Sequence, residues 1–120
     1  MHIDMKKKPI TNYLRMHRRR NGLTQDDVAF LLGAFCRTVV SRHEYSGYTP
    51  KLGRALAFEL IFDTRARDLY PEEFAAVEAT VKGRAKKLLE RVKREPDSVR
   101  RARRLALLKG IIRGGGSRAA

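Results

Sequence analysis

The sequence predicts an all-α protein, and three observations support this prediction. Apolar residues recur at spacings of three and four along most of the chain, and no strand-like alternation persists for more than a few residues. Capping residues such as Thr24 and Thr49 precede apolar runs. Pro71 and the pair Glu95-Pro96 fall where one run ends and another begins. The 120 residues suffice for one compact domain with an appended element.

The first two helices have clear ends in the sequence. Residues 12–21 precede Gly22, a residue type that commonly follows a helix C-terminus. Thr24 and Asp27 have the spacing of a capping box, which places a second helix over residues 24–32, before Gly33.

The third and fourth helices follow a tight connection at Gly33-Ala34-Phe35. A short helix is expected over residues 36–45, with Val40 in the core because it is apolar in the middle of the segment. Thr49 and Pro50 indicate the start of a fourth helix, since proline is tolerated at the first helical position. We expect the fourth helix to bury a stripe formed by Leu52, Leu56, Leu60 and Ile61.

The remaining segments predict three more helices and a tail. Thr64 is expected to cap a brief helix that reaches Leu69 and stops at Pro71. A long helix then runs from Pro71 to about Arg94, and a seventh begins at a cap provided by Asp97 or Ser98. The seventh helix is amphipathic through Val99, Ala102, Leu105, Leu108 and Ile112. We expect residues 114–120 to be a disordered tail.

The charge of the chain predicts a polyanionic partner. Lys and Arg total 27 against 13 Asp and Glu, a net charge of +14. Basic residues outnumber acidic ones by seven to one in residues 1–21 and by thirteen to three in residues 82–113, whereas residues 22–81 carry six basic and nine acidic residues. Nucleic acids, anionic membranes and acidic proteins are all partners that such a distribution of positive charge could bind.

Other compositional features exclude several classes of protein. Cys36 is the single cysteine, which excludes an intrachain disulfide and suits a reducing cytoplasm. His2, His17 and His43 lack the spacing and the cysteine partners of a metal site, and His43 is expected to pack. Nucleophile–base constellations and phosphate-binding glycine loops are missing, so we expect neither an enzyme nor a cofactor. No secretory signal or membrane-spanning apolar run is expected, which favours a cytoplasmic location.

Residues 13–70 resemble the Cro and phage-repressor type of helix-turn-helix domain, the Xre family. The resemblance rests on elements in the expected order, namely Leu14, Arg18, Gly22-Leu23-Thr24-Gln25, Val28-Ala29, Leu32-Gly33, Val40-Ser41-Arg42, Glu44, Gly47, Pro50, Leu56-Ala57 and Leu69. It implies a five-helix DNA-binding domain over residues 12–70, with a basic N-terminal arm (1–11) and two basic C-terminal helices (71–113) on either side.

The resemblance also implies residues that contact DNA. The first residues of the third helix contact base edges in the family, and the matching positions here are Arg37, Thr38, Ser41 and Arg42. An arginine can donate two hydrogen bonds to guanine, although binding of Arg37 and Arg42 to phosphate alone is the alternative. The positions implied as phosphate contacts are Thr24, Gln25, Arg18, Lys51 and Tyr48.

Several of these assignments have alternatives. Arg18 and Glu44 match positions that pair in relatives, so Arg18 is either structural or oriented toward a phosphate. Tyr48 either packs or donates to a phosphate through its hydroxyl. The segment from Gly33 to Ser41 is one residue longer than the usual family spacing, and Phe35-Cys36 replaces the usual small polar cap. The register of the third helix is therefore open by about one residue.

The C-terminal helices suggest a second interaction. The seam formed by Phe74, Val77, Val81, Ala85, Leu88 and Val92 has to be covered, either by the first five helices or by a second copy of the chain. We expect a homodimer, because repressors of this type bind two half-sites symmetrically. The basic face of this region is expected to contact flanking phosphates or an acidic partner protein.

The sequence thus favours a sequence-specific regulator of transcription, a repressor that binds double-stranded DNA at a two-fold symmetric operator. One alternative is an antitoxin that represses its own operon and holds a toxin with its C-terminal helices. The other is an RNA-binding or protein-interaction module that uses the same fold without an operator.

Overall fold

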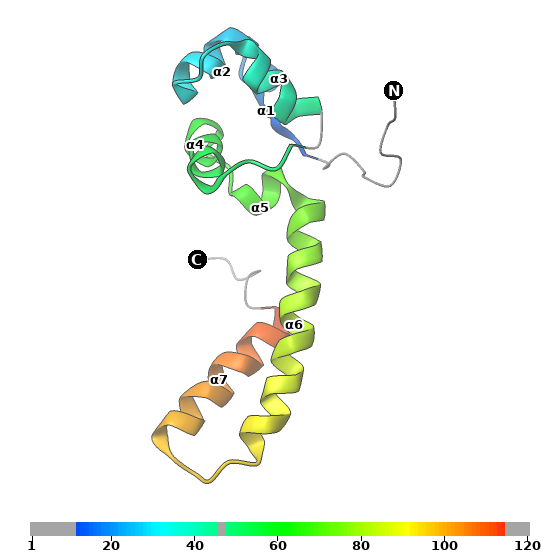
Figure 1. The fold of residues 1–120 in the computed structure, drawn as a ribbon, viewed down its shortest axis with the longest axis vertical. Helices are drawn as coiled ribbons and strands as arrows, with labels where there is room; N and C mark the ends of the chain where they lie inside the picture. The colour runs from blue at the N-terminus through cyan, green and yellow to red at the C-terminus, as the bar shows by residue number, and fades with distance from the viewer. Residues whose placement is uncertain (1–11, 46–47, 115–120) are drawn as a thin grey trace. The chain divides into compact units, whose positions relative to one another are not determined.

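The computed structural model describes residues 12–45 and 48–114, all of its regular structure being helical. The helices are α1 (Leu14–Arg20), α2 (Gln25–Leu32), α3 (Arg37–Tyr45), α4 (Leu52–Phe62), α5 (Ala66–Leu69), α6 (Pro71–Lys93) and α7 (Val99–Arg113) (Figure 1). The chain divides into two compact units, Met1–Phe74 and Ala75–Ala120. The predicted all-α class and the order of the seven helices are confirmed. The expected arm (1–11) and all of the expected tail (114–120) except Gly114 lie outside the described residues.

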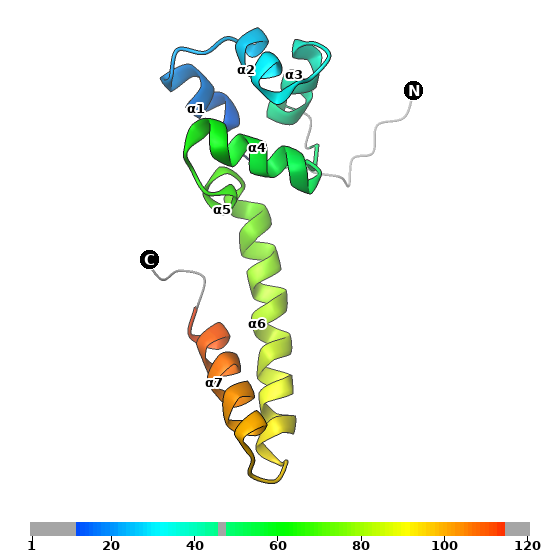
Figure 2. The same ribbon diagram turned by 90° about the vertical axis from the view of Figure 1, so that its left-hand side faces the viewer.

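Helices α1 to α5 are grouped together in the first unit (Figure 2), and all five contribute side chains to one hydrophobic core. Its most deeply buried side chains, each about 1% exposed, are Leu14, Val28, Val40, Phe58 and Leu69. Every one of the five short helices thus supplies an anchor, and burying such a side chain contributes about 1.5–3 kcal/mol. The core holds α2 and α3 in place, because neither is long enough to be stable alone in water.

The ends of α1 and α2 follow the local sequence signals. Gly22 has a φ of +72°, and the N–H groups of Gly22 and Leu23 donate to the carbonyls of Arg19 and Arg18 at 3.0 Å, which closes α1. The Thr24 hydroxyl accepts from the Asp27 N–H at 3.0 Å, and the Asp27 carboxylate accepts from the Thr24 N–H at 2.9 Å. The predicted capping box is therefore present.

The connection between α2 and α3 is tight. Gly33 ends α2 with a φ of +69°, a left-handed conformation that favours glycine, and the Ala34 N–H donates back to the Ala29 carbonyl at 2.9 Å. Phe35 then lies fully exposed in the turn. Helix α3 begins at Arg37, one residue after the predicted start, and Val40 is in the core as predicted.

Helix α4 differs from the prediction in its start and in its buried face. It begins at Leu52, after Lys51 rather than Thr49. Leu52, Leu56 and Leu60 are 74%, 54% and 84% exposed, so the expectation that they form the buried stripe was wrong. The residues packed in the core are Phe58, Phe62 and, in part, Ile61. Helix α4 is apolar on two opposite sides, and the side with the larger aromatic side chains is the one that is buried.

The start of α5 was also assigned to the wrong residue. Thr64 does not cap it, because the Thr64 hydroxyl donates to the Phe62 carbonyl at 2.9 Å. The Ala66 N–H instead donates to the Glu59 carboxylate at 3.2 Å, so a side chain from α4 satisfies the first turn of α5. The helix ends at Leu69 as predicted.

In the second unit, α7 runs back beside the C-terminal half of α6 (Figures 1 and 2). Ala85 and Val92 of α6 and Leu108 of α7 form its buried core, with Leu88, Leu89, Leu105, Ile111 and Ile112 packed around them. Helix α7 therefore covers the C-terminal half of the α6 seam. The sequence suggests cover by the first five helices or by a second copy of the chain, and neither includes α7. Val77 and Val81, in the preceding turns of α6, remain about half exposed.

The loop between α6 and α7 is closed by polar contacts. The Ser98 hydroxyl accepts from the Arg101 N–H at 3.0 Å, so Ser98 is the cap. The Arg101 guanidinium donates to the carbonyls of Val92 and Lys93, at 3.2 and 3.0 Å, and thereby satisfies the C-terminal end of α6. None of the described helices combines the length and apolar character needed to cross a membrane.

Candidate nucleic-acid interface

Helix α3 has one buried and one outward side. Val40 and His43 are 1% and 3% exposed and face the core. At ~100° per residue, positions 37, 38, 41, 42 and 45 fall in the remaining arc of about 140°. Arg37, Thr38 and Arg42 are exposed and Ser41 is half-buried. The structure therefore brings the four predicted base-contacting residues together on one side of one short helix.

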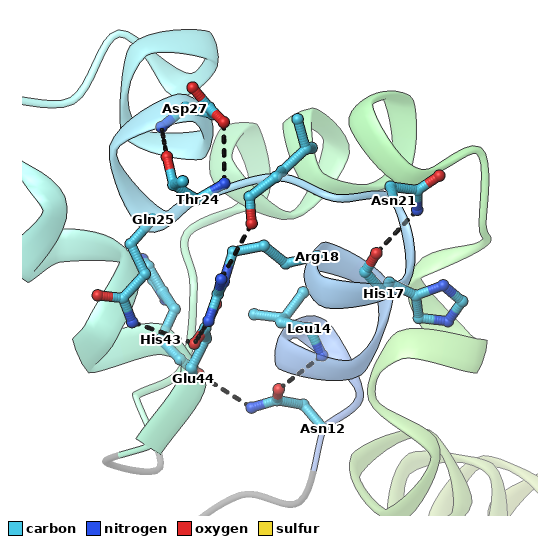
Figure 3. A network of polar contacts seen from close by, with 11 residues as sticks. Asn12, Leu14, His17, Arg18, Asn21, Thr24, Gln25, Asp27, His43 and Glu44 are labelled. Atoms are coloured by element: carbon cyan, nitrogen blue, oxygen red, sulfur yellow. Dashed lines mark hydrogen bonds and ion pairs between the residues drawn. The ribbon is translucent and has the colours of Figure 1, made fainter.

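A buried carboxylate fixes the position of α3 relative to α1 and α2. Glu44, whose side chain is 1% exposed, accepts two hydrogen bonds from the Arg18 guanidinium, from Nε at 2.6 Å and from Nη2 at 3.2 Å (Figure 3). The Gln25 amide donates to the same carboxylate at 3.2 Å. Because residues from α1, α2 and α3 converge on one group, the three helices are tied together at the side where α2 begins.

This network limits what Arg18 can do. All three of its guanidinium nitrogens are engaged, since Nη1 also donates to the Leu23 carbonyl at 3.0 Å, and its side chain is 11% exposed. The hydrogen bond to Glu44 raises the pKa of Arg18, against the opposing effect of burial. Of the two roles predicted for Arg18, the geometry favours the structural one.

A second contact, from the start of α1, reaches the same last turn of α3. The Asn12 amide donates to the His43 carbonyl at 2.9 Å, and its oxygen accepts from the Leu14 N–H at 3.0 Å (Figure 3). Asn12 thus joins the start of α1 to the last turn of α3. Sequence reasoning did not single out this residue, because an asparagine before a helix indicates a local cap and gives no sign of a partner 31 positions away.

An open hollow of about 610 Å³ lies at the N-terminal end of α2. Its lining includes Arg19, Thr24, Gln25 and Arg37, with Asp26 as the one acidic member. Asp26 lies 3.8 Å from the Arg37 guanidinium, and both side chains are more than two-thirds exposed, so this ion pair is weak. Helix N-termini attract anions, and the basic lining adds to that attraction.

The start of α3 departs from the usual polar cap. Hydrogen bonds from the Thr38 side chain and backbone lower the pKa of the exposed Cys36 thiol below its ordinary value. Cys36 stands immediately before the first turn, where a serine or threonine is the usual residue. The buried Val40 fixes which side of α3 is outward.

Tyr48 and Lys51, two predicted phosphate contacts, lie in the segment between α3 and α4. The Tyr48 ring meets the buried His43 ring edge-on at a centroid distance of 5.1 Å, while the tyrosine stays 47% exposed. Tyr48 therefore packs against α3 and also reaches solvent. Lys51 is exposed, immediately before α4. His43 is buried and packs against the core residue Phe58, as expected.

The second unit presents a strongly basic surface. Four of its basic side chains have acidic partners, in the pairs Lys82–Glu78, Lys93–Glu90, Arg101–Asp97 and Arg104–Glu95. Nine others are exposed and have no ion pair among the described residues, namely Arg84, Lys86, Lys87, Arg91, Arg94, Arg100, Arg103, Lys109 and Arg113. The acidic residues of the second unit are already in these four ion pairs, so its surface has an excess of positive charge.

Comparison with models of known families, with curated proteins and with solved structures finds no match to this chain. The resemblance to the Cro-type domain therefore stays a prediction.

Proposed function

We propose that this chain is a sequence-specific, double-stranded DNA-binding regulator of transcription, built on a Cro-type five-helix domain. In this proposal α2 and α3 are the helix-turn-helix, and α3 enters the major groove. A major groove about 12 Å wide admits one helix, and the arginines and hydroxyls on the outward side of α3 are the side-chain types that recognise base edges.

The observation that carries the proposal is the contrast between the two sides of α3. Its inner side is held by Val40, His43 and Glu44, all with buried side chains. Its outer side offers Arg37, Thr38, Ser41 and Arg42. A short polar helix held this firmly is suited to position side chains on a rigid partner, since a contact made from a fixed backbone loses less entropy on binding.

Phosphate contacts would come from both ends of this helix pair. At the N-terminus of α2, Gln25 and Thr24 line the basic hollow, and the Gln25 amide oxygen remains on the side away from its bond to Glu44 (Figure 3). On the other side, Lys51 and Tyr48 lie before α4. The exposed cations of α6 and α7 would add contacts independent of sequence, because they are numerous and lack local acids.

The exposed leucines of α4 support a homodimer. Leu52, Leu56 and Leu60 repeat every four residues and fall within an arc of about 80°, which makes one continuous apolar stripe. Such a stripe can pair with its own copy about a two-fold axis, which buries the apolar surface of both chains. We place the dimer contact on α4 rather than on the α6 seam, because α7 covers part of that seam.

Selection from a random duplex library tests this function. The full chain should enrich a palindrome whose half-sites lie about one helical turn, 34–36 Å, apart. Recovery of unrelated sequences with equal affinity, or equal binding of structured RNA, would contradict a sequence-specific regulator and favour the interaction module. The selection also separates the dimer from the monomer, because a monomer enriches a single half-site.

A further inference from the structure

A second hollow of about 610 Å³ opens between α3 and α4, apart from the one at the start of α2. It is lined by Val39, His43, Tyr48, Thr49, Lys51, Gly53 and Arg54. Lys51 and Arg54 are cationic, Tyr48 and Thr49 carry hydroxyls, and none of the described residues that line the hollow is acidic. Its volume lies within the range of about 300–1,000 Å³ that is usual for small-molecule sites.

Two of the side chains that line this hollow carry a buried polar atom that has no hydrogen-bond partner among the described residues. These atoms are Nδ1 of His43 and Nη1 of Arg54. His43 is 97% buried, since its exposure is 3%. Leaving a buried polar group unpaired costs about 1–3 kcal/mol, and more where the group is charged. An arginine nitrogen can only donate, so the missing partner of Arg54 must be an acceptor.

We propose that this hollow is a binding site for a phosphate-type oxyanion, held by Arg54 and His43 with help from Lys51 and the hydroxyl of Tyr48 or Thr49. A phosphate group accepts from the Arg54 guanidinium and from the N–H of a neutral His43 ring, so one ligand can pair with both side chains. Gly53 leaves room for the anion, because a Cβ built at this position meets no atom within 4 Å.

The anion has two possible sources with the same chemistry. One is a free phosphorylated small molecule, which would make the hollow a ligand site next to α3. The other is a phosphate of the DNA backbone, in which case the inference rests on the proposed function and adds Arg54 and His43 to its phosphate contacts. His43 lies on α3 itself, so an anion bound here would touch the same helix that carries the outward arginines.

Gly53 allows a test that leaves the lining side chains intact. Gly53→Asp places a carboxylate at the hollow, in the first turn of α4, where a negative charge favours the helix. Gly83→Asp is the matched control, because Gly83 is also a helical glycine with open space, and it changes the net charge equally. Arg54→Met removes the proposed donor directly, and circular dichroism verifies that each variant is folded.

The probe is inorganic phosphate, titrated against the full chain at constant ionic strength with chloride as the reference anion. The imidazole nitrogens of His43 are followed by NMR. We expect a saturable shift of the His43 signal in the parent and in Gly83→Asp, and at least a tenfold weaker response in Gly53→Asp and Arg54→Met. A His43 signal that phosphate and chloride move alike, or a response that survives in Gly53→Asp and Arg54→Met, would overturn the site.

The phosphate titration contains no DNA, so its failure leaves the proposed function untouched, and failure of the library selection leaves the site untouched. Competition then identifies the source of the anion. If phosphate displaces a bound duplex from the parent more effectively than from Arg54→Met, the DNA backbone occupies the hollow. If phosphate saturates His43 while the duplex stays bound, the site belongs to a free ligand.

Discussion

At the scale of single residues, Glu44 connects three helices of the candidate interface. It is buried on α3 and accepts from Arg18 of α1 and Gln25 of α2. A buried carboxylate is costly unless it is paired, and the bidentate guanidinium provides that pairing. The outward arginines of α3 therefore depend on a residue that does not itself reach solvent.

Arg18→Met should lower the free energy of unfolding by about 3–5 kcal/mol, because it leaves the Glu44 charge buried without a cation. The double variant Arg18→Met with Glu44→Met should recover most of that loss, since no unpaired charge remains. Urea unfolding followed by circular dichroism measures both values. A loss below about 1 kcal/mol in the single variant would show that the pair is not structural.

His43 should make stability depend on pH. Burial, and next the positive charge of Arg54, lower the pKa of His43 below its ordinary value of 6.5. The unfolded chain therefore binds this proton more tightly than the folded one. The contribution to stability is full above pH 6.5 and is lost as the pH falls from there through the lowered pKa of the folded protein.

The measurement is urea unfolding at about pH 7.5 and pH 5.5 in phosphate-free buffer. The parent should be less stable at the lower pH, and His43→Phe should lose most of that difference, because an aromatic ring that cannot be protonated takes the same place between Tyr48 and Phe58. The control variant His17→Asn should keep the difference in stability between the two pH values. An equal pH dependence in the parent and in His43→Phe would contradict this explanation.

At the scale of helices, local signals and tertiary contacts were predictable to different degrees. The capping box of α2 and the glycine end of α1 were predicted correctly, because each depends on residues within a few positions. The cap of α5 was missed because it comes from Glu59 of another helix. The Arg18–Glu44 pair followed from a family resemblance, whereas the Asn12–His43 contact and the hollow at Arg54 depend on how helices pack.

Helix α4 shows why a periodic pattern alone can mislead. Its leucine stripe and its phenylalanine pair have equally good helical spacing, and a single sequence does not tell which one faces the core. The stripe left exposed is the basis of the proposed dimer. This makes α4 the element at which the proposed assembly can be tested separately from the fold.

Leu60→Glu should convert a dimer into a monomer without loss of helix content, because Leu60 is 84% exposed in the single chain. Like charges at a two-fold contact repel each other, and the apolar area is lost at the same time. Sedimentation or light scattering measures the mass, and Val77→Glu on α6 is the control on the other exposed apolar face. A dimer that survives Leu60→Glu and dissociates with Val77→Glu would place the contact on α6.

At the scale of the whole molecule, the proposed function assigns base recognition to one unit and most of the unpaired positive charge to the other. The first unit, Met1–Phe74, carries the outward residues of α3, and the second, Ala75–Ala120, carries nine exposed cations without ion pairs among the described residues. Base contacts determine sequence preference, and phosphate contacts add affinity for every duplex and make it depend on salt. Loss of an arginine should therefore have different consequences in the two units.

The most direct test of the central claim compares Arg42→Ala on α3 with Arg103→Ala on α7, each measured on the selected duplex and on duplexes with single-base changes. Arg42→Ala should cost about 1–3 kcal/mol on the preferred site and abolish discrimination at one position of each half-site. Arg103→Ala should weaken all duplexes by one smaller factor. If Arg42→Ala lowers the affinity for every duplex equally, as Arg103→Ala does, α3 does not contact bases and the proposed function is contradicted.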